Sequence, residues 1–219
     1  MIQGAIFDMD GTLLDTMPLW DRAGALYLSG LGVEAEEDLG KRLFPMTTAE
    51  AAAYLQSTYR LPLSIPAIAE GIHRTVEGFY LHDAPLKPGV SAFLHRLHAL
   101  GIPMAVATVT ERDCTAAALK RTGVLPLFKA VFTADEVGRG KDQPDIYLKA
   151  AEALGSAPAR TLVFEDALHA LCTARAAGFC TVGVYDDASR DEQTALRRAG
   201  AYYLTSFTEV SSLASELTR

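Results

Sequence analysis

Residues 3–12 read QGAIFDMDGT, and this stretch decides the fold that the sequence predicts. Segment 3–7 is apolar and stops at Asp8, which is typical of a short strand covered on both faces. Ligands of open α/β sheets bind outside the carboxyl ends of the strands. Two carboxylates one residue apart, Asp8 and Asp10, repel each other there unless a cation lies between them. Segment 8–12 is therefore a candidate for metal and substrate binding, with a plain Asp/Gly turn as the alternative.

Further apolar runs alternate with helix patterns from about residue 86 onward. The helix patterns have an early Pro or polar residue and a closing Gly, which is the usual asymmetry of helix ends. In one of them, Thr110 followed by Asp113 resembles a capping box, so we expect Thr110 to cap that helix. The alternation predicts an α/β fold: a doubly wound, Rossmann-like parallel sheet with helices on both faces. The further strands are expected at 103–109, 130–133, 161–164, 181–185 and 201–204.

The stretch between the first strand and this alternation contains no strand pattern. It reads as helices broken at Gly30 and Gly32 and at Pro45, Pro62 and Pro66. A chain of 219 residues has room for one α/β domain that carries a smaller insert. We therefore expect a helical cap domain over 16–83, inserted into a core domain formed by 1–15 and 84–219.

Composition excludes several classes of partner. The chain has 20 basic and 27 acidic side chains, a net charge of -7, whereas a nucleic-acid binder needs a basic face. No apolar run approaches the roughly 18 residues of a membrane span, and the early aspartates do not fit a signal peptide. The three cysteines lack a CxxC spacing, so neither a disulfide framework nor a zinc site is indicated. We expect a cytoplasmic protein that binds neither nucleic acid nor membranes, with a monomer as the default.

Candidate polar groups follow several of the expected strands. Thr108 lies at the end of the second strand, Lys141 follows a Gly-Arg-Gly loop, and Glu165 and Asp166 end the run TLVF. A parallel sheet gathers such groups at one rim, which places acids, a hydroxyl and an ammonium in one cleft. Mg²⁺ prefers oxygen ligands and often bridges carboxylate to phosphate. The pattern therefore indicates a site for a metal-bound phosphate.

These motifs, in this order, resemble the haloacid dehalogenase superfamily. The resemblance rests on DMDGT, Thr108, the run GRGKDQPDIYLKA that contains Lys141, VFED, and LKPGVSAFLHRL before the second strand. It covers nearly the whole chain, and the helical insert resembles the small helical cap of that family. The segment LLDTMPLWDRA is similar to sugar-phosphate phosphatases of the 2-deoxyglucose-6-phosphate phosphatase type and, more loosely, to β-phosphoglucomutase.

The resemblance implies a role for each matching acidic residue. Asp8 corresponds to the nucleophile that forms an aspartyl-phosphate, and Asp10 to the acid and base that serves the leaving alcohol and the attacking water. Mg²⁺ would be held by Asp8, by the backbone carbonyl of Asp10 and by Asp166. Glu165 would be a water-mediated ligand or a partner of the ligands, with a helix cap as the alternative.

The resemblance also implies phosphate and substrate contacts. Thr108 would donate to a phosphate oxygen, although threonine is common in strands in any case. Lys141 would neutralise the phosphate and hold Asp8. Trp20 and the cap loop around Met46 would meet the substrate, with cap-core and surface roles as the alternatives. The expected substrate- and phosphate-binding set is Gly11, Thr12, Thr108, Val109, Lys141, Trp20 and Met46.

Departures from the family pattern narrow the chemistry. Haloacid dehalogenases lack an acid at the Asp10 position, so its presence implies an alcohol leaving group. The mutase has a histidine where this chain has Trp20, which favours hydrolysis over isomerisation. Ala167 and Ala170 replace a serine and a glycine of the family, so the packing around the last motif must differ.

The sequence thus predicts a Mg²⁺-dependent phosphatase, a phosphoric monoester hydrolase, that acts on a small phosphorylated metabolite such as a sugar phosphate. A sugar-phosphate mutase of the β-phosphoglucomutase type is the first alternative. A catalytically silent sugar-phosphate-binding regulatory protein is an alternative of another class.

Overall fold

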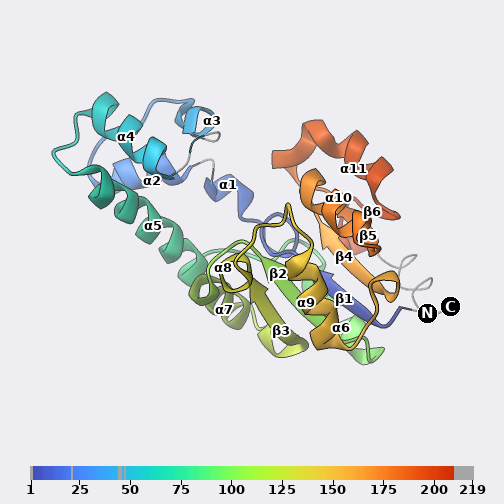
Figure 1. Ribbon diagram of the computed structural model, residues 1–219. Coiled ribbons are helices and arrows are strands. Elements are labelled where there is room, and N and C mark those ends of the chain that lie inside the picture. The colour runs from blue at the N-terminus through green and yellow to red at the C-terminus, as the bar shows by residue number, and fades with distance from the viewer. Residues whose placement is uncertain (1, 21, 44–45, 47, 210–219) are drawn as a thin grey trace. The chain divides into compact units, whose positions relative to one another are not determined.

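The computed structural model describes residues 2–209, apart from 21, 44, 45 and 47 (Figure 1). The described residues form two compact units. One runs up to Asp15 and continues from Pro85 onward, and the other runs from Thr16 to Ala84. The second unit ends one residue later than the sequence predicts, because the N–H of Ala84 donates to the carbonyl of Phe79 (2.9 Å) and ties Ala84 to the preceding helix.

The first unit is built on a six-stranded parallel sheet with the order β3-β2-β1-β4-β5-β6 (Figure 1). This confirms the predicted doubly wound α/β fold. The chain leaves β1 towards β2 and β3, and later returns to the other side of β1 with β4. Such a reversal of strand order creates a crevice at the carboxyl ends of the strands, where ligands of this architecture bind. The strands are β1 (Gly4–Phe7), β2 (Met104–Thr108), β3 (Phe128–Thr133), β4 (Thr161–Glu165), β5 (Cys180–Val184) and β6 (Tyr202–Leu204).

Successive side chains of β1 and β4 alternate between the two faces of the sheet, as in any strand. On one face, Ile6 and Val163 pack with helices α9 (Asp145–Leu154) and α10 (Leu168–Ala176). On the other face, Phe7 stacks on Phe164 with ring centroids 4.4 Å apart, and Phe93 of α6 (Val90–Ala99) contacts both rings edge-on. Both faces are therefore covered, which explains why β1 reads as a continuous apolar run.

This unit also contains α7 (Arg112–Arg121), α8 (Ala134–Val137) and α11 (Gln193–Ala199). The capping box predicted at Thr110 is wrong: the residue before α7 is Glu111, and its side chain makes no cap hydrogen bond. A capping box occurs instead at α8, where Thr133 and Glu136 satisfy each other's backbone N–H groups.

The second unit is helical, with α1 (Met17–Trp20), α2 (Ala23–Gly30), α3 (Leu39–Leu43), α4 (Thr48–Tyr59) and α5 (Ile65–His82). Its core includes Leu28, Leu55 and Ile68. The helix break predicted at Pro66 is wrong. This proline lies in the first turn of α5, where a missing N–H costs nothing, and Ser64 caps that turn. In the described part of the chain, no helix combines the length and the apolar character that a membrane crossing requires.

We predict that Phe7→Ala lowers the free energy of unfolding by about 3–5 kcal/mol, because it removes a ring at the centre of the aromatic cluster. Urea unfolding followed by circular dichroism measures the change. Leu148→Ala, at a side chain of α9 that is 43% exposed, is the control and should cost less than about 1 kcal/mol. Equal losses in the two variants would contradict this account of the core.

Candidate active site

Asp8 and Glu165 lie side by side at the carboxyl ends of β1 and β4. Asp8 comes two residues after Ile6 and Glu165 two residues after Val163, so strand alternation directs both carboxylates towards the face that α9 covers. The ladder between the strands reaches this point, since the N–H of Asp8 donates to the carbonyl of Phe164 (3.0 Å). Both carboxylates are buried.

The ammonium of Lys141 lies between these two carboxylates. Lys141 belongs to the loop before α9 and is only 6% exposed. Its Nζ donates to Oδ1 of Asp8 and to Oε1 of Glu165 (2.5 Å). The hydroxyl of Tyr147, from the first turn of α9, donates to the same Oε1 of Glu165 (2.7 Å). Glu165 therefore acts as the anchor that holds Lys141 against Asp8.

Burial and charge oppose each other in this cluster. Burial alone lowers the pKa of Lys141, but the carboxylates of Asp8 and Glu165 outweigh it and raise the pKa above its ordinary value, so Lys141 is a cation. Burial raises the pKa of Asp8 well above its ordinary value, although Lys141 counteracts this. Burial also raises the pKa of Tyr147, so its hydroxyl keeps its proton and stays a donor. The single positive charge of Lys141 does not fully compensate the negative charges of the buried carboxylates.

Asp166 completes the acidic cluster. Its Oδ1 accepts a hydrogen bond from the hydroxyl of Thr12 (2.9 Å), and burial raises its pKa to about 7, with Glu165 adding to the effect. Gly11 passes close by with φ of +75°, and a Cβ on Gly11 would overlap Oδ2 of Asp166. Only glycine fits there, because the site needs both a left-handed backbone and room for Asp166. The N–H of Gly11 donates to the carbonyl of Leu14 (2.9 Å).

The acidic cluster fits a divalent metal ion. Carboxylate oxygens of Asp8, Glu165 and Asp166 lie within 4.8 Å of one another, and all three residues are buried. Oxygen ligands of this kind suit Mg²⁺. If all three are ionised, Lys141 leaves two negative charges uncompensated, which a divalent cation would balance. Asp8 and Asp166 are the better ligands, because Oε1 of Glu165 already accepts two hydrogen bonds.

The segment that follows β2 contacts the carboxylate of Asp10. The hydroxyl of Thr110 donates to Oδ2 of Asp10 (2.5 Å), and the N–H of Thr110 donates to Oγ1 of Thr108 (3.0 Å). Thr110 therefore contacts the candidate acid and does not cap α7. Val109, between the two threonines, is 58% exposed at this rim. Asp10, which follows β1, and Thr108 and Val109, at the end of β2, thus lie near the carboxyl ends of these strands.

The predicted substrate contacts of the helical unit lie only partly within the described residues. Met46 is described, half-buried, with its N–H donating to the carbonyl of Leu43 (2.9 Å). The side chain of Trp20 lies outside the described part of the chain, as do residues 44, 45 and 47 of the same loop. Arg42, a basic residue beside that loop, pairs with Glu36 (3.3 Å) inside the unit.

Sequence reasoning missed two residues around the site, Tyr147 and Lys87. Tyr147 belongs to the buried stripe of α9 and so reads as a core residue. Lys87 donates to the carbonyls of Gly11 (2.7 Å) and Tyr185 (2.6 Å) and to Oδ2 of Asp186 (2.9 Å). It thereby fastens the loop after β1 to the segment after β5. The only signal was the position of Lys87 beside Pro88-Gly89, and a loop lysine is usually a solvated surface residue.

The profile of the haloacid dehalogenase-like hydrolases matches residues 2–178. The chain belongs to this family. The match confirms the resemblance that the motifs predict.

Related proteins agree with this assignment. A phosphorylated carbohydrates phosphatase of Thermotoga maritima is 29% identical over 217 residues, which is 99% of this chain and 100% of that protein. Hexitol phosphatase A of Escherichia coli is 34% identical over 192 residues, 83% of this chain and 82% of that protein. A Thermotoga maritima crystal structure, provisionally described as a β-phosphoglucomutase, superposes with a TM-score of 0.88 at 28% identity, covering 99% of this chain and 100% of that one. These relatives confirm the predicted class, a phosphoric monoester hydrolase.

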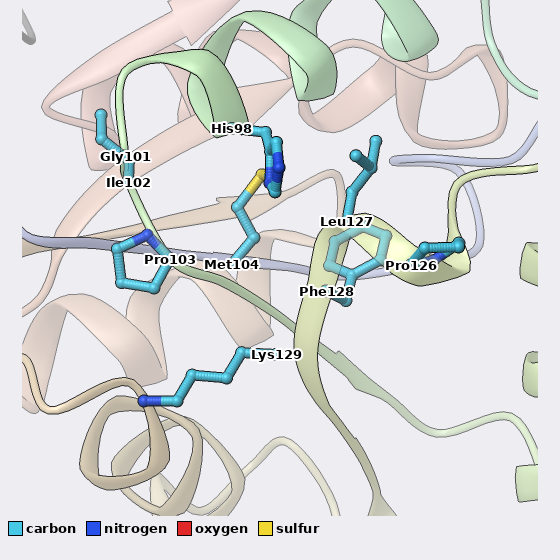
Figure 2. A pocket seen from close by; sticks show the side chains of 9 residues that line it. All are labelled: His98, Gly101, Ile102, Pro103, Met104, Pro126, Leu127, Phe128 and Lys129. Atoms are coloured by element: carbon cyan, nitrogen blue, oxygen red, sulfur yellow. The ribbon is translucent and has the colours of Figure 1, made fainter.

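A cavity of about 290 Å³ in this hydrolase is lined by nine residues (Figure 2), and none of them belongs to the acidic cluster. Its lining includes Pro103 and Met104 at the start of β2 and Phe128 at the start of β3. The cavity therefore belongs to the amino ends of the strands, opposite the rim that carries Asp8. It takes no part in the site.

We predict that Lys87→Met destabilises this hydrolase by about 3–5 kcal/mol, because it leaves the buried carboxylate of Asp186 without its cation. Adding Asp186→Asn should recover part of the loss, since no buried charge then remains unpaired. Urea unfolding of the two variants and of Lys149→Met, an exposed lysine of α9, measures the effect. Similar unfolding free energies for Lys87→Met and Lys149→Met would contradict the buried pair.

Proposed function

We propose that this hydrolase is a Mg²⁺-dependent phosphatase of small phosphorylated metabolites, with sugar phosphates as the substrate class and Asp8 as the nucleophile. The observation that carries the proposal is the buried cluster in which Lys141 joins Asp8 to Glu165 beside Asp166. A carboxylate fixed at a sheet rim by an ammonium is placed to attack, while the cation favours the negative charge of a phosphoryl group.

The first half-reaction transfers the phosphoryl group to the enzyme. A carboxylate oxygen of Asp8 attacks phosphorus, and the bond from phosphorus to the substrate oxygen breaks. Asp10 donates a proton to that leaving oxygen, which departs as an alcohol. Lys141 keeps Asp8 in place and offsets charge that develops on the transferring group.

The second half-reaction restores the enzyme. Asp10, now ionised, takes a proton from a water molecule, whose oxygen attacks phosphorus. The bond between phosphorus and Asp8 breaks, and inorganic phosphate leaves with the Asp8 carboxylate regenerated. One residue thus serves as acid in the first step and as base in the second.

The metal would be held by Asp8, Asp166 and the backbone carbonyl of Asp10, with Glu165 supporting the ligands. When bound, Mg²⁺ neutralises phosphate charge and orients the phosphoryl group. Thr12, whose hydroxyl bonds Asp166, fixes the direction of that ligand. Gly11 supplies the space beside Asp166 that a larger residue would fill.

Phosphate contacts come from the rim of β2 and the loop after β1. The Oγ1 of Thr108 accepts the N–H of Thr110, which leaves its single hydroxyl hydrogen for a phosphate oxygen. Backbone N–H groups at Val109 and at Thr12 add donors for the other oxygens. Lys141 supplies the fixed positive charge.

Substrate class is inferred from relatives and from the second unit. The names of two related phosphatases refer to phosphorylated carbohydrates and to hexitol. The helical unit would serve as the cap that selects the substrate, with Trp20 and Met46 as its candidate contacts. A small ligand also agrees with the net charge of -7, which disfavours an extended polyanion.

A sugar-phosphate mutase is the second candidate, favoured by the structure from Thermotoga maritima described provisionally as a β-phosphoglucomutase. A mutase returns the phosphoryl group to a second hydroxyl and does not pass it to water. Incubation with β-glucose 1-phosphate and a trace of the 1,6-bisphosphate separates the two. Formation of glucose 6-phosphate without release of phosphate would select the mutase, and release of phosphate selects the phosphatase.

Asp8→Asn should lower phosphate release from a panel of sugar phosphates by more than about 10³-fold, because an amide does not act as the nucleophile. A malachite-green assay measures the release. Asp135→Asn removes an exposed carboxylate of α8 and should retain activity within about twofold. Substantial turnover by Asp8→Asn would reject Asp8 as the nucleophile.

Mg²⁺ should raise the melting temperature of the wild-type protein and should not raise that of Asp166→Asn. A ligand that binds only the folded state stabilises it by about 2.7 kcal/mol at a hundred times its dissociation constant. Differential scanning fluorimetry with and without EDTA measures the shift, independently of turnover. Glu152→Gln, at an exposed site of α9, is the control and should respond like the wild type. An unchanged response in Asp166→Asn would remove Asp166 from the metal site.

A further inference from the structure

Lys87 holds the loop after β1 with an ammonium that uses all of its donors. Its Nζ donates to the carbonyls of Gly11 (2.7 Å) and Tyr185 (2.6 Å) and to Oδ2 of Asp186 (2.9 Å). An ammonium has three hydrogens and accepts no hydrogen bond, so the direction of each bond is fixed. The side chain of Lys87 is 15% exposed, and all three partners belong to the first unit. The three contacts are thus largely shielded from water.

Both ends of this contact are themselves held in place. Asp186 is buried, and its other oxygen, Oδ1, accepts the N–H of Ala188 (2.9 Å). The backbone N–H of Lys87 donates to the carbonyl of Leu13 (2.9 Å), which belongs to the same loop as Gly11. Lys87 therefore contacts that loop twice, with its backbone at Leu13 and with its ammonium at Gly11.

Gly11 is the residue of this loop with the widest choice of backbone conformations, and its φ is +75°. A peptide group is planar and trans, so a hydrogen bond to its N–H or to its carbonyl sets the direction of both. The N–H of Gly11 donates to the carbonyl of Leu14 (2.9 Å), which orients the peptide between Asp10 and Gly11. Lys87 orients the next peptide, between Gly11 and Thr12. Both peptide groups that flank the glycine are therefore fixed.

Groups that the proposed function assigns to the metal lie on either side of Gly11. The carbonyl of Asp10, a proposed ligand, precedes it. Thr12, whose hydroxyl bonds Oδ1 of Asp166 (2.9 Å), follows it. The direction of one group relative to the other depends on the backbone angles of Gly11. By fixing the peptide after Gly11, Lys87 therefore helps to fix the Asp10 carbonyl relative to the carboxylate of Asp166.

We propose that Lys87 is a positioning residue for the metal site, which holds the Gly11 carbonyl and so keeps the Asp10 carbonyl and Asp166 in the geometry that binds Mg²⁺. The proposal rests on the function proposed above, in which these two groups are ligands. An ammonium has no lone pair to offer a cation, so Lys87 acts through the loop and is not itself a ligand. Residues that orient metal ligands are worth about 10–100-fold in metal affinity.

The test separates the position of Lys87 from its charge. Removing a positive charge beside an acidic site would by itself strengthen the binding of Mg²⁺, whereas loss of the contact with Gly11 should weaken it. The double variant Lys87→Met with Asp186→Asn removes both charges of the pair and leaves the net charge unchanged. We expect its dissociation constant for Mg²⁺ to be about 10–100-fold higher than that of the wild type. Isothermal titration calorimetry with MgCl2 at constant ionic strength measures both constants.

Two further variants also leave the net charge unchanged. Lys87→Arg keeps the cation, but a guanidinium whose donors lie in one plane does not match three acceptors grouped around one ammonium nitrogen. Its dissociation constant for Mg²⁺ should rise by at least about threefold. Arg74→Met with Glu70→Gln removes an exposed ion pair of α5 (3.0 Å) and is the control. Its constant should stay within about twofold of that of the wild type.

Melting temperatures in EDTA distinguish the positioning role from a merely structural one. A structural role lowers the melting temperature of the double variant but leaves the Mg²⁺ dissociation constant of the folded protein unchanged, and that result would overturn the proposal. If the double variant is unfolded at the temperature of the titration, Lys87→Arg decides, and a wild-type constant in that variant would overturn the proposal equally. A wild-type protein that binds no Mg²⁺ would instead reject the metal in the proposed function, and the positioning role would fall with it.

Discussion

The site depends on one buried ammonium that several buried carboxylates share. Lys141 touches Asp8 and Glu165, and Asp166 lies within reach of both acids. Burying a charge is costly unless it is paired and hydrogen-bonded, so none of these groups could stay in place alone. Removing Lys141 would leave Asp8 facing two further carboxylates in a dry environment. The contacts of Lys141 with Asp8 and Glu165 therefore help to hold the loop before α9 against the ends of β1 and β4.

The same contact explains why an acidic chain can serve an anionic substrate. The carboxylates outnumber the ammonium, and burial raises the pKa of both Asp8 and Asp166, so the cluster favours either protons or a cation. A divalent cation would reverse the local field and attract a single phosphate. A net charge of -7 thus disfavours a long polyanion without disfavouring a small phosphate ester.

The sequence predicted the strands that a local apolar run specifies. The apolar run before Asp8 predicted β1, and strand periodicity then placed Asp8 at a carboxyl end. Contacts between distant segments were beyond reach: nothing in the spacing indicated that Tyr147 would bond Glu165, or that Lys87 would reach Gly11. A tyrosine on a buried helix face is usually a core residue, and a lysine in a loop is usually solvated. Only the tertiary fold brings Tyr147 to Glu165 and Lys87 to Gly11.

Thr110 and Pro66 illustrate why local rules failed where they did. A capping box is a local pattern, and at Thr110 a carboxylate 100 residues away competes for the same hydroxyl. Pro66 was read as a break, although a proline suits the first turn of a helix and Ser64 provides the cap. In both cases the outcome depended on where the helix starts: Thr110 lies too far before α7 to cap it, and Pro66 lies inside the first turn of α5.

The proposed mechanism requires that Asp8 becomes phosphorylated during turnover. Rapid acid quenching of the enzyme during turnover of a sugar phosphate, followed by digestion and peptide mass spectrometry, tests it directly. We predict one phosphoryl group on the peptide that contains Asp8, present in the wild type during turnover and absent after the substrate is exhausted. Turnover with no phosphorylated enzyme at any quench time, or a phosphoryl group on another residue, would contradict it.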